Sequence, residues 1–409
     1  MNSKEIFALA LGLSSPWEIS DIRIEETAKG NKEFHIEKKF KRGSKFKLPD
    51  GTEVGVYDTV KRSWQHLNIF EHTTYLHCSV PRIKDKSGNV RQVEVPWARK
   101  GSGFTLLFES LAMALIEKEM PVNKVAELLR VYPKRIWTIF NYWLSIAYLE
   151  DNQQEVTNIG IDETSSKKGH QYVTIVADMD KRRVLFATEG KNKEAIRKLK
   201  KHFSTKGVLT EQIKNISIDM SPSFISGVLE EFPNSSIVFD KFHVVKLLNE
   251  AMNEVRKKER REHAILKGHK NTFLKKNKNL SQRERQQREE LIELLPTIGE
   301  SYRLKELFND FWEFKNKEEA SAFLSFWCDN VEESGIVPFK EFVKMIKAHW
   351  FGIVNYFEAK ISNGVLEGIN NKIQLAKRRA RGYRNTTNFI NMILFIAGKL
   401  KFNYPLYST

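Results

Sequence analysis

Three short apolar runs that each end in an aspartate constrain the fold of this chain more than any other feature. The runs are TNIGID, IKNISID and SSIVFD, which end at Asp162, Asp219 and Asp240. Two further strand-like runs, HQYVTIVADMD and RRVLFATEG, follow the first, and amphipathic helical segments separate and follow the later ones. The predicted order for residues 157–250 is β-β-β-α-β-α-β-α. This order predicts an α/β fold with a mixed five-stranded sheet, in which a three-strand meander is followed by right-handed crossovers.

The first and second of these aspartates predict a metal site. Asp162 closes the first predicted strand and Asp219 the fourth, so both side chains emerge at one edge if the strands are neighbours. Two carboxylates that lie close together repel each other unless cations lie between them. Mg²⁺ prefers oxygen ligands and keeps several waters, which suits a site with few protein ligands and a bound phosphate. Two such ions about 3.5–4 Å apart can clamp an in-line phosphoryl displacement.

A third carboxylate is needed to complete the shell of a second ion, and Glu367 is the best candidate. It lies on a helix that is predicted to return to the sheet after a long helical segment. Asn370 and Asn371 follow three and four residues later, on the same face of that helix. They are candidates for orienting a carboxylate or for a hydrogen bond to a phosphate.

Asp240 leaves an alternative open. A lone aspartate at a strand end is most often a turn or cap residue, but Asp240 could also replace Asp219, or support the site together with His243. Glu163 follows Asp162 directly and is expected to point to the opposite face of the sheet, because side chains alternate along a strand.

Clustered positive charge predicts a nucleic-acid partner. The formal net charge is +16 in 409 residues, and such a surplus attracts polyanions. Six cations follow Glu367 without an intervening acid: Lys372, Lys377, Arg378, Arg379, Arg381 and Arg384. We expect them to bind phosphates, although a solvated charged face is the simpler alternative. Lys167 and Lys168 are expected at a hairpin tip, either as DNA contacts or as an ordinary basic turn.

Residues 104–149 have the pattern of a helix-turn-helix. The segments FTLLFESLAMALIEKEM, PVNKVAELL and PKRIWTIFNYWLSIAYL are helical by spacing, with Thr105 as the expected N-cap of the first. The helix that opens at Pro133 carries Lys134 and Arg135 at the end that enters a DNA groove in this motif. An ordinary helical hairpin is the alternative.

The remaining segments exclude several classes of protein. Residues 1 to about 100 have the short-strand pattern of a β-rich module, and residues 251–355 are helical and charged. Cys78 and Cys328 cannot form a disulfide framework, and without a CxxC pair we do not expect a zinc ribbon. We see no signal peptide, and the longest apolar stretch, residues 389–397, is too short to span a bilayer. These features predict a protein of the reducing cytoplasm.

At these motifs the chain resembles the bacterial ISL3-type insertion-sequence transposases. The similar stretches are IGIDETSSKKGHQYVTIVADMDKRRV, SIDMSPSF, VFDKFHVVKLLNEA and SNGVLEGINNKIQLAKRRARGYRN, with VPWARKGSGFT before them. The resemblance implies an RNase H-like core with a DDE triad, which falls on Asp162, Asp219 and Glu367. It also implies Mg²⁺ as the cofactor, for which Mn²⁺ can substitute. Many relatives carry paired cysteines in an N-terminal zinc-ribbon-like region, whereas residues 85–88 here read Asp-Lys-Ser-Gly.

The resulting prediction is a transposase that binds terminal inverted repeats, cleaves DNA at element ends and transfers 3′-hydroxyls to target DNA. It divides the chain into a β-rich, zinc-ribbon-like module without cysteines (1–100), a helix-turn-helix (101–150), the first part of the catalytic core (151–250), an all-α insertion (251–355) and the last part of the core (356–409). Double-stranded DNA and a second copy of the chain are the expected partners, in the bacterial nucleoid. The alternatives are an inactive or domesticated DNA-binding repressor and an RNase H-like nuclease acting on RNA or branched DNA.

Overall fold

The computed structural model describes residues 2–28, 30–167, 171–275, 279–359, 361 and 364–404. The chain divides into two compact units, one formed by Met1–Leu149 with Lys401–Thr409 and the other by Glu150–Leu400. Each unit is described by itself below. The helix-turn-helix and the β-rich module share the first unit, and the aspartate-bearing strands form the second.

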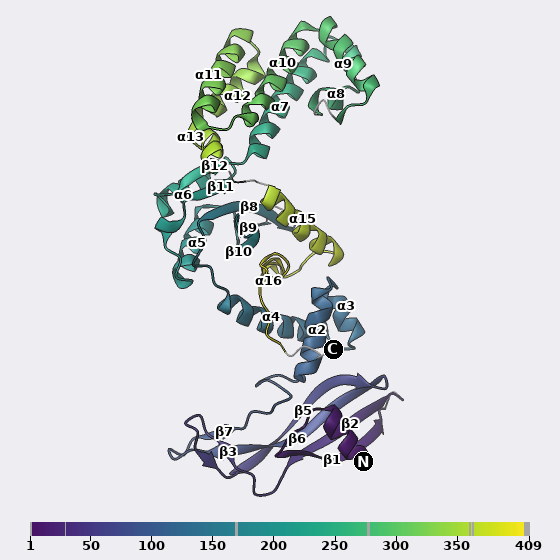
Figure 1. Cartoon of the computed structure of the whole chain (residues 1–409). Coiled ribbons are helices and arrows are strands. Elements are labelled where there is room, and N and C mark those ends of the chain that lie inside the picture. The colour runs from purple at the N-terminus through teal and green to yellow at the C-terminus, as the bar shows by residue number, and fades with distance from the viewer. Residues whose placement is uncertain are drawn as a thin grey trace. The chain divides into compact units, whose positions relative to one another are not determined.

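A β-sheet dominates the first unit (Figure 1). Its elements are α1 (Ser3–Ala10), β1 (Trp17–Glu26), β2 (Lys32–Phe40), β5 (Asp58–Ile69), β6 (His72–Lys84) and β7 (Val90–Gln92), with β3 (Phe46–Lys47) and β4 (Glu53–Val54) forming a separate hairpin. The strand order is β1-β2-β6-β5, with β7 paired to β6. The sequence predicts short strands within residues 51–67, 74–83 and 91–99, with a turn at 84–89, and β1 and β2 enlarge that module.

One face of this sheet is apolar and holds the core of the first unit. The indole of Trp97 packs edge-on against Trp17 and Trp64, at ring-centroid distances of 5.0 and 5.7 Å. Cys78 is buried in the same cluster as a free thiol. The predicted turn at Asp85 joins β6 to β7, and its carboxylate accepts a hydrogen bond from the backbone of Asn89.

Three helices follow the sheet: α2 (Leu106–Glu117), α3 (Val122–Leu128) and α4 (Pro133–Glu150). Thr105 caps α2, as expected, because its hydroxyl accepts a hydrogen bond from Phe108 N. Pro133 opens α4, as the sequence predicts. Pro121 is the N-cap of α3 rather than a residue of its first turn, which is a small correction.

The second unit is built on the predicted five-stranded mixed sheet. Its strands are β8 (Asn158–Lys167), β9 (Gln171–Asp178), β10 (Arg183–Glu189), β11 (Asn215–Ile218) and β12 (Ser236–Phe239), in the order β10-β9-β8-β11-β12. β8, β11 and β12 run parallel, and β9 and β10 complete an antiparallel meander. The expected placement of Asp162 at the end of its strand is wrong, because β9 pairs with β8 as far as Lys167.

Helices cover both faces of this sheet (Figure 1). They are α5 (Lys193–Thr205) and α6 (Pro222–Glu231) from the crossovers, and α15 (Gly364–Arg379) and α16 (Thr386–Ala397) from the C-terminal part. Helix α7 (Lys241–Glu259) follows β12 and leads away from the sheet. Ile159 and Ile161 join the core that contains α5 and α6. Gly160 lies between them and faces Leu366 of α15 instead. Successive residues of β8 therefore face opposite sides of the sheet, and each side is covered by a different set of helices.

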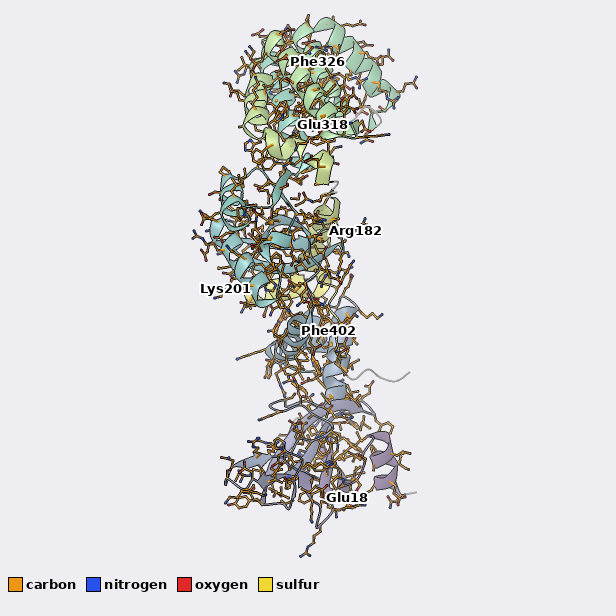
Figure 2. All side chains as sticks on the ribbon, turned by 60° about the vertical axis from the view of Figure 1, so that its left-hand side comes forward. Glu18, Arg182, Lys201, Glu318, Phe326 and Phe402 are labelled. Atoms are coloured by element: carbon orange, nitrogen blue, oxygen red, sulfur yellow. The ribbon has the colours of Figure 1, made fainter. Side chains whose placement is uncertain are left out.

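The described residues between β12 and α15 are helical. Besides α7 and short 3₁₀ turns, they form α8 (Lys270–Leu274), α9 (Gln282–Leu294), α10 (Pro296–Asp310), α11 (Lys317–Ser334), α12 (Val337–Ala348), α13 (Trp350–Val354) and α14 (Tyr356–Ala359). Trp327 of α11 is fully buried against Phe308, whereas Phe326 lies on the outer face and is 56% exposed (Figure 2). Among the described residues, no helix has the length and apolar character that crossing a membrane requires.

Candidate active site

Three parallel strands bring three aspartates into one row. Ser217 of β11 lies opposite Gly160 of β8 on one side and Val238 of β12 on the other. Asp162, Asp219 and Asp240 follow these three residues by two positions, with Asp219 directly after the end of β11 and Asp240 directly after the end of β12. Neighbouring strands are about 4.8 Å apart, and residues two positions apart share a face. The three carboxylates therefore start from adjacent backbone positions on the face that α15 covers.

Helix α15 runs alongside β8 and is held there by polar contacts. Asn370 Nδ2 donates a hydrogen bond of 2.6 Å to Asp162 Oδ2, and Gln374 Nε2 donates one of 2.8 Å to Thr164 Oγ1. Lys377 Nζ donates to the carbonyl oxygen of Ser165 at 2.6 Å. Three contacts over two turns fix which face of the helix meets the strand.

Gly160 allows this close approach. A Cβ atom added at Gly160 would lie 2.5 Å from Met179 Sδ and 2.9 Å from Leu366 Cδ1, closer than van der Waals contact allows. The absence of a side chain in the middle of β8 thus lets Leu366 pack onto the strand, one turn before Asn370 reaches Asp162.

The cluster is electrostatically coupled. Burial raises the pKa of Asp162 above its ordinary value, and the charges of Asp240 and Asp219 raise it further. The Glu163 backbone amide and the charge of His243 act in the opposite direction. Because the aspartates disfavour one another's ionisation, a cation among them would relieve the repulsion.

Asp240 has two roles. It is the N-cap of α7, where its Oδ1 accepts a hydrogen bond of 2.6 Å from Phe242 N, and its Oδ2 lies 3.3 Å from His243 Nδ1. This interaction is the main reason that the pKa of His243 is raised, with Asp219 and Asp162 adding to it. One alternative from the sequence is that Asp240 supports the site together with His243. The structure places these two side chains in contact.

Glu163 is on the other face of the sheet, as strand alternation predicts. Its carboxylate lies 4.0 Å from Lys191 Nζ, and burial raises its pKa most strongly. Asp219 accepts a hydrogen bond of 3.0 Å from Ser221 N, which fixes the turn into α6.

Glu367 lies on the same helix as Asn370. It is exposed in the first turn of α15, three residues and therefore about 4.5 Å along the helix axis before Asn370. The residue that reaches Asp162 is Asn370. Among the residues that the structure describes, no three acidic, histidine or cysteine side chains are already arranged to hold a metal ion. Asp162 and Asp219 fit a divalent cation as neighbouring oxygen donors.

The predicted phosphate-binding cations are mostly exposed. Those on and after α15 are Lys372, Arg378, Arg379, Arg381 and Arg384, all exposed, and Lys377, which is half-buried against β8. Asn371 is exposed as well. Lys167 is the last residue of β8 and pairs with Gln171. Lys168 lies outside the described residues.

Lys134 and Arg135 are exposed at the start of α4, where a helix-turn-helix contacts DNA. The Arg135 guanidinium lies 4.0 Å from the centre of the Phe104 ring, a cation–π contact that restricts its orientation. Neither this contact nor the role of Gln374 is predicted by the sequence patterns described above. Gln374 follows Asn370 by four residues, a spacing that would have placed it on the same helix face.

Comparison with known proteins decides the family. The model of the DDE transposases of the ISL3 type, described as a transposase, matches residues 159–393, which is more than half of the chain. The chain belongs to the ISL3 family of transposases. The matched segment of this transposase contains the aspartate row and α15. The helix-turn-helix domain of transposase family ISL3 matches residues 93–144, which confirms the predicted motif.

Two curated relatives of this ISL3 transposase match across most of their length. The transposase for insertion sequence element IS1001 of Bordetella parapertussis is 26% identical over 345 residues, 82% of this chain and 84% of the relative. The transposase for insertion sequence element IS1557 of Mycobacterium tuberculosis is 26% identical over 433 aligned positions, 97% of this chain and 96% of the relative. The chain is thus a DNA transposase, with the predicted DDE and helix-turn-helix domains.

Proposed function

We propose that this transposase binds the terminal inverted repeats of its insertion sequence, cleaves a phosphodiester at each element end and joins the freed 3′-hydroxyls to target DNA. The observation that carries the proposal is the pair Asp162 and Asp219, which follow the paired residues Gly160 and Ser217 of two parallel strands by two positions, with Asn370 hydrogen-bonded to Asp162. This pair provides oxygen donors at adjacent backbone positions in an RNase H-like arrangement of strands.

The aspartates would hold divalent cations, with Mg²⁺ as the natural ion and Mn²⁺ as a substitute. Bound cations supply charge neutralisation at the phosphate and lower the pKa of an attacking water or hydroxyl. Glu367 would complete the ligand set in the DNA complex. Its exposure and its position one turn from Asn370 support this role, since no packing contact in the described part of the chain has to break. Asp240 and His243 would support Asp219 from the neighbouring strand.

DNA would contact the basic residues on both units. Lys134 and Arg135 would contact the terminal repeat, and the cations of and after α15 would bind phosphates beside the aspartates. Lys167 and Lys168 would contact the backbone of a DNA end, and Asn371 would bind a phosphate. Because two ends must be joined, the active form would be a homodimer on DNA, in the cytoplasmic nucleoid of a bacterium.

A plasmid excision and integration assay tests the proposal. Asp162→Asn and Asp219→Asn keep the size of each side chain but remove a charge, so excision should fall at least a thousandfold. Glu194→Gln, an exposed change on α5, should leave activity unchanged. Full activity in Asp162→Asn would remove the metal-dependent mechanism.

A second candidate is a DNA-binding protein without catalytic activity. One observation favours it: in the described part of the chain, three potential metal ligands are not gathered at one point. Nicking of end-containing DNA with Mg²⁺ or Mn²⁺ distinguishes the two functions. End-specific binding without nicking in either metal would favour the second candidate, and a preference for RNA hybrids or branched DNA would indicate a nuclease.

A further inference from the structure

A cleft of about 970 Å³ lies in the first unit, lined by β3, β5, β6, β7 and the segment that leads to α2. Neither Lys134 nor Arg135 of the helix-turn-helix lines it. We call it the basic cleft, after the four exposed cations that line it: Lys47, Arg62, Arg91 and Lys100.

The inner part of the basic cleft is apolar. Trp64, Ile83 and Val95 line it and are buried. Residues two apart on a strand share a face, so Arg62 projects from the same face of β5 as Trp64. The basic cleft therefore has an apolar inner part and positively charged side chains, such as Arg62, at its opening.

The charge of the basic cleft is unbalanced. Glu94 is the single acidic residue among its described lining residues. A fifth cation, Arg99, is engaged elsewhere, since it pairs with buried Glu109 at 2.9 Å and stacks on Tyr142.

The four cations that define the basic cleft differ from Arg99, because none of them forms an ion pair with a described carboxylate. Arg62 is held by a hydrogen bond of 3.1 Å from its Nε to Gln92 Oε1, which restricts the side chain without neutralising it. Four cations from four separate segments, with one carboxylate among the described lining residues, attract an extended polyanion rather than a single small anion.

We propose that the basic cleft binds the sugar–phosphate backbone of duplex DNA, as a contact separate from the helix-turn-helix. Binding of duplex DNA by the basic cleft does not depend on the proposed function; only the assignment of that DNA to the element end rests on it. Contacts to phosphates fix position and register, whereas contacts to base edges read sequence. The basic cleft would thus hold the duplex against the first unit while Lys134 and Arg135 approach the bases.

The test measures the salt dependence of binding by the full-length protein to two labelled duplexes, one containing the element end and one with a scrambled sequence. Each lost phosphate contact lowers the slope of log K against log salt by about 0.9. Arg91→Ala/Lys100→Ala should therefore lower the slope by about 2 for both duplexes. Affinity at physiological salt should fall about tenfold.

Lys39→Ala/Lys61→Ala is the matched control. It removes the same charge from the same sheet, but both lysines are on the face opposite Cys78 and Arg62. Its slope should stay near that of the wild type. Circular dichroism and thermal melting check folding, and Arg62→Gln provides a second, milder variant of the basic cleft.

The outcomes separate the two proposals. Equal slopes for the cleft and control variants, or competition by mononucleotides at micromolar concentration, would overturn the basic cleft as a duplex site. If the wild type still prefers and cleaves end DNA in that case, the proposed function stands. If the wild type binds both duplexes equally and cleaves neither, the proposed function is overturned. Even then, a change of salt slope that occurs only in the cleft variants would support duplex binding by the basic cleft.

Discussion

Asn370 and Asp162 are 208 positions apart in the chain and meet through a hydrogen bond of 2.6 Å. The amide nitrogen donates to the carboxylate oxygen from the centre of α15, and the side-chain oxygen of Asn370 is buried without a hydrogen-bond partner among the described residues. The bond fixes the orientation of the Asp162 carboxylate, and the remaining oxygen is an acceptor directed into the same buried region.

The first prediction concerns this bond. Asn370→Ala should lower the rate of DNA cleavage about tenfold with little change in DNA affinity, because the carboxylate loses its orienting donor. The lost hydrogen bond to a charged group should also raise the pKa of Asp162 and move the acidic limb of the pH–rate profile upward. Single-turnover cleavage across pH measures both effects. Gln374→Ala, which removes the neighbouring donor to Thr164 and leaves the Asp162 bond in place, is the control, and an equal effect there would contradict the assignment.

The second prediction concerns Glu367. Glu367→Gln should abolish cleavage while leaving the melting temperature and DNA affinity of the metal-free protein unchanged, because the side chain is exposed. Cleavage and melting are measured on the same preparation. Wild-type cleavage by this variant would exclude Glu367 as the third ligand and would direct attention to Asp240.

The third prediction concerns packing between β8 and α15. Gly160→Ala should reduce the free energy of unfolding by about 1–3 kcal/mol, because its Cβ overlaps Met179 and Leu366. Gly368→Ala is the matched control, since nothing lies within 4 Å of an added Cβ there. That change should stabilise the helix by about 0.5–1 kcal/mol. Urea unfolding measures both, and equal effects of the two changes would contradict the packing argument.

The fourth prediction concerns metal binding. Mg²⁺ or Mn²⁺ should raise the melting temperature of the wild type, because a ligand that binds only the folded state stabilises it in proportion to RT ln(1 + [L]/Kd). Asp162→Asn/Asp219→Asn should lose this response, and chelator should reverse it in the wild type. Differential scanning fluorimetry is the measurement, and an equal rise in the double variant would place the ion elsewhere.

The fifth prediction concerns pH and the first unit. Burial, with a contribution from Lys38, lowers the pKa of His66 to about 4, and His66 Nδ1 lies 2.8 Å from the hydroxyl of Thr105. A histidine whose folded pKa is depressed contributes stability that is present above its unfolded pKa of about 6.5. That stability is lost as the pH falls toward 4, and it amounts to no more than about 3 kcal/mol.

Urea unfolding of wild type and His66→Gln between about pH 7.5 and 4 checks this prediction. The stability difference between the two proteins should be largest near pH 7 and should shrink as the pH falls through 6.5. His72→Gln, which changes a half-buried histidine of the same sheet, serves as the comparison. A difference that stays constant with pH would show that His66 is not held neutral by burial.

The sequence by itself determined the strands and the order of the elements in the sheet of the second unit. Apolar alternation predicted five strands, helical spacing predicted α5, α6 and α7, and the acidic residues marked the edge where a site could form. These signals are local, since each depends on residues within one strand or helix. The sequence also placed Asn370 on the same helix face as Glu367.

Tertiary structure alone decided which residues meet. β8 continues past Asp162 because β9 still provides hydrogen bonds after the pairing with β11 ends, so the aspartate lies within a strand. Asn370 contacts Asp162 because the packing of Leu366 on Gly160 sets how α15 lies against β8. Each helical residue turns the side-chain direction by about 100°, and no local pattern fixes where that rotation begins relative to a strand 200 positions away.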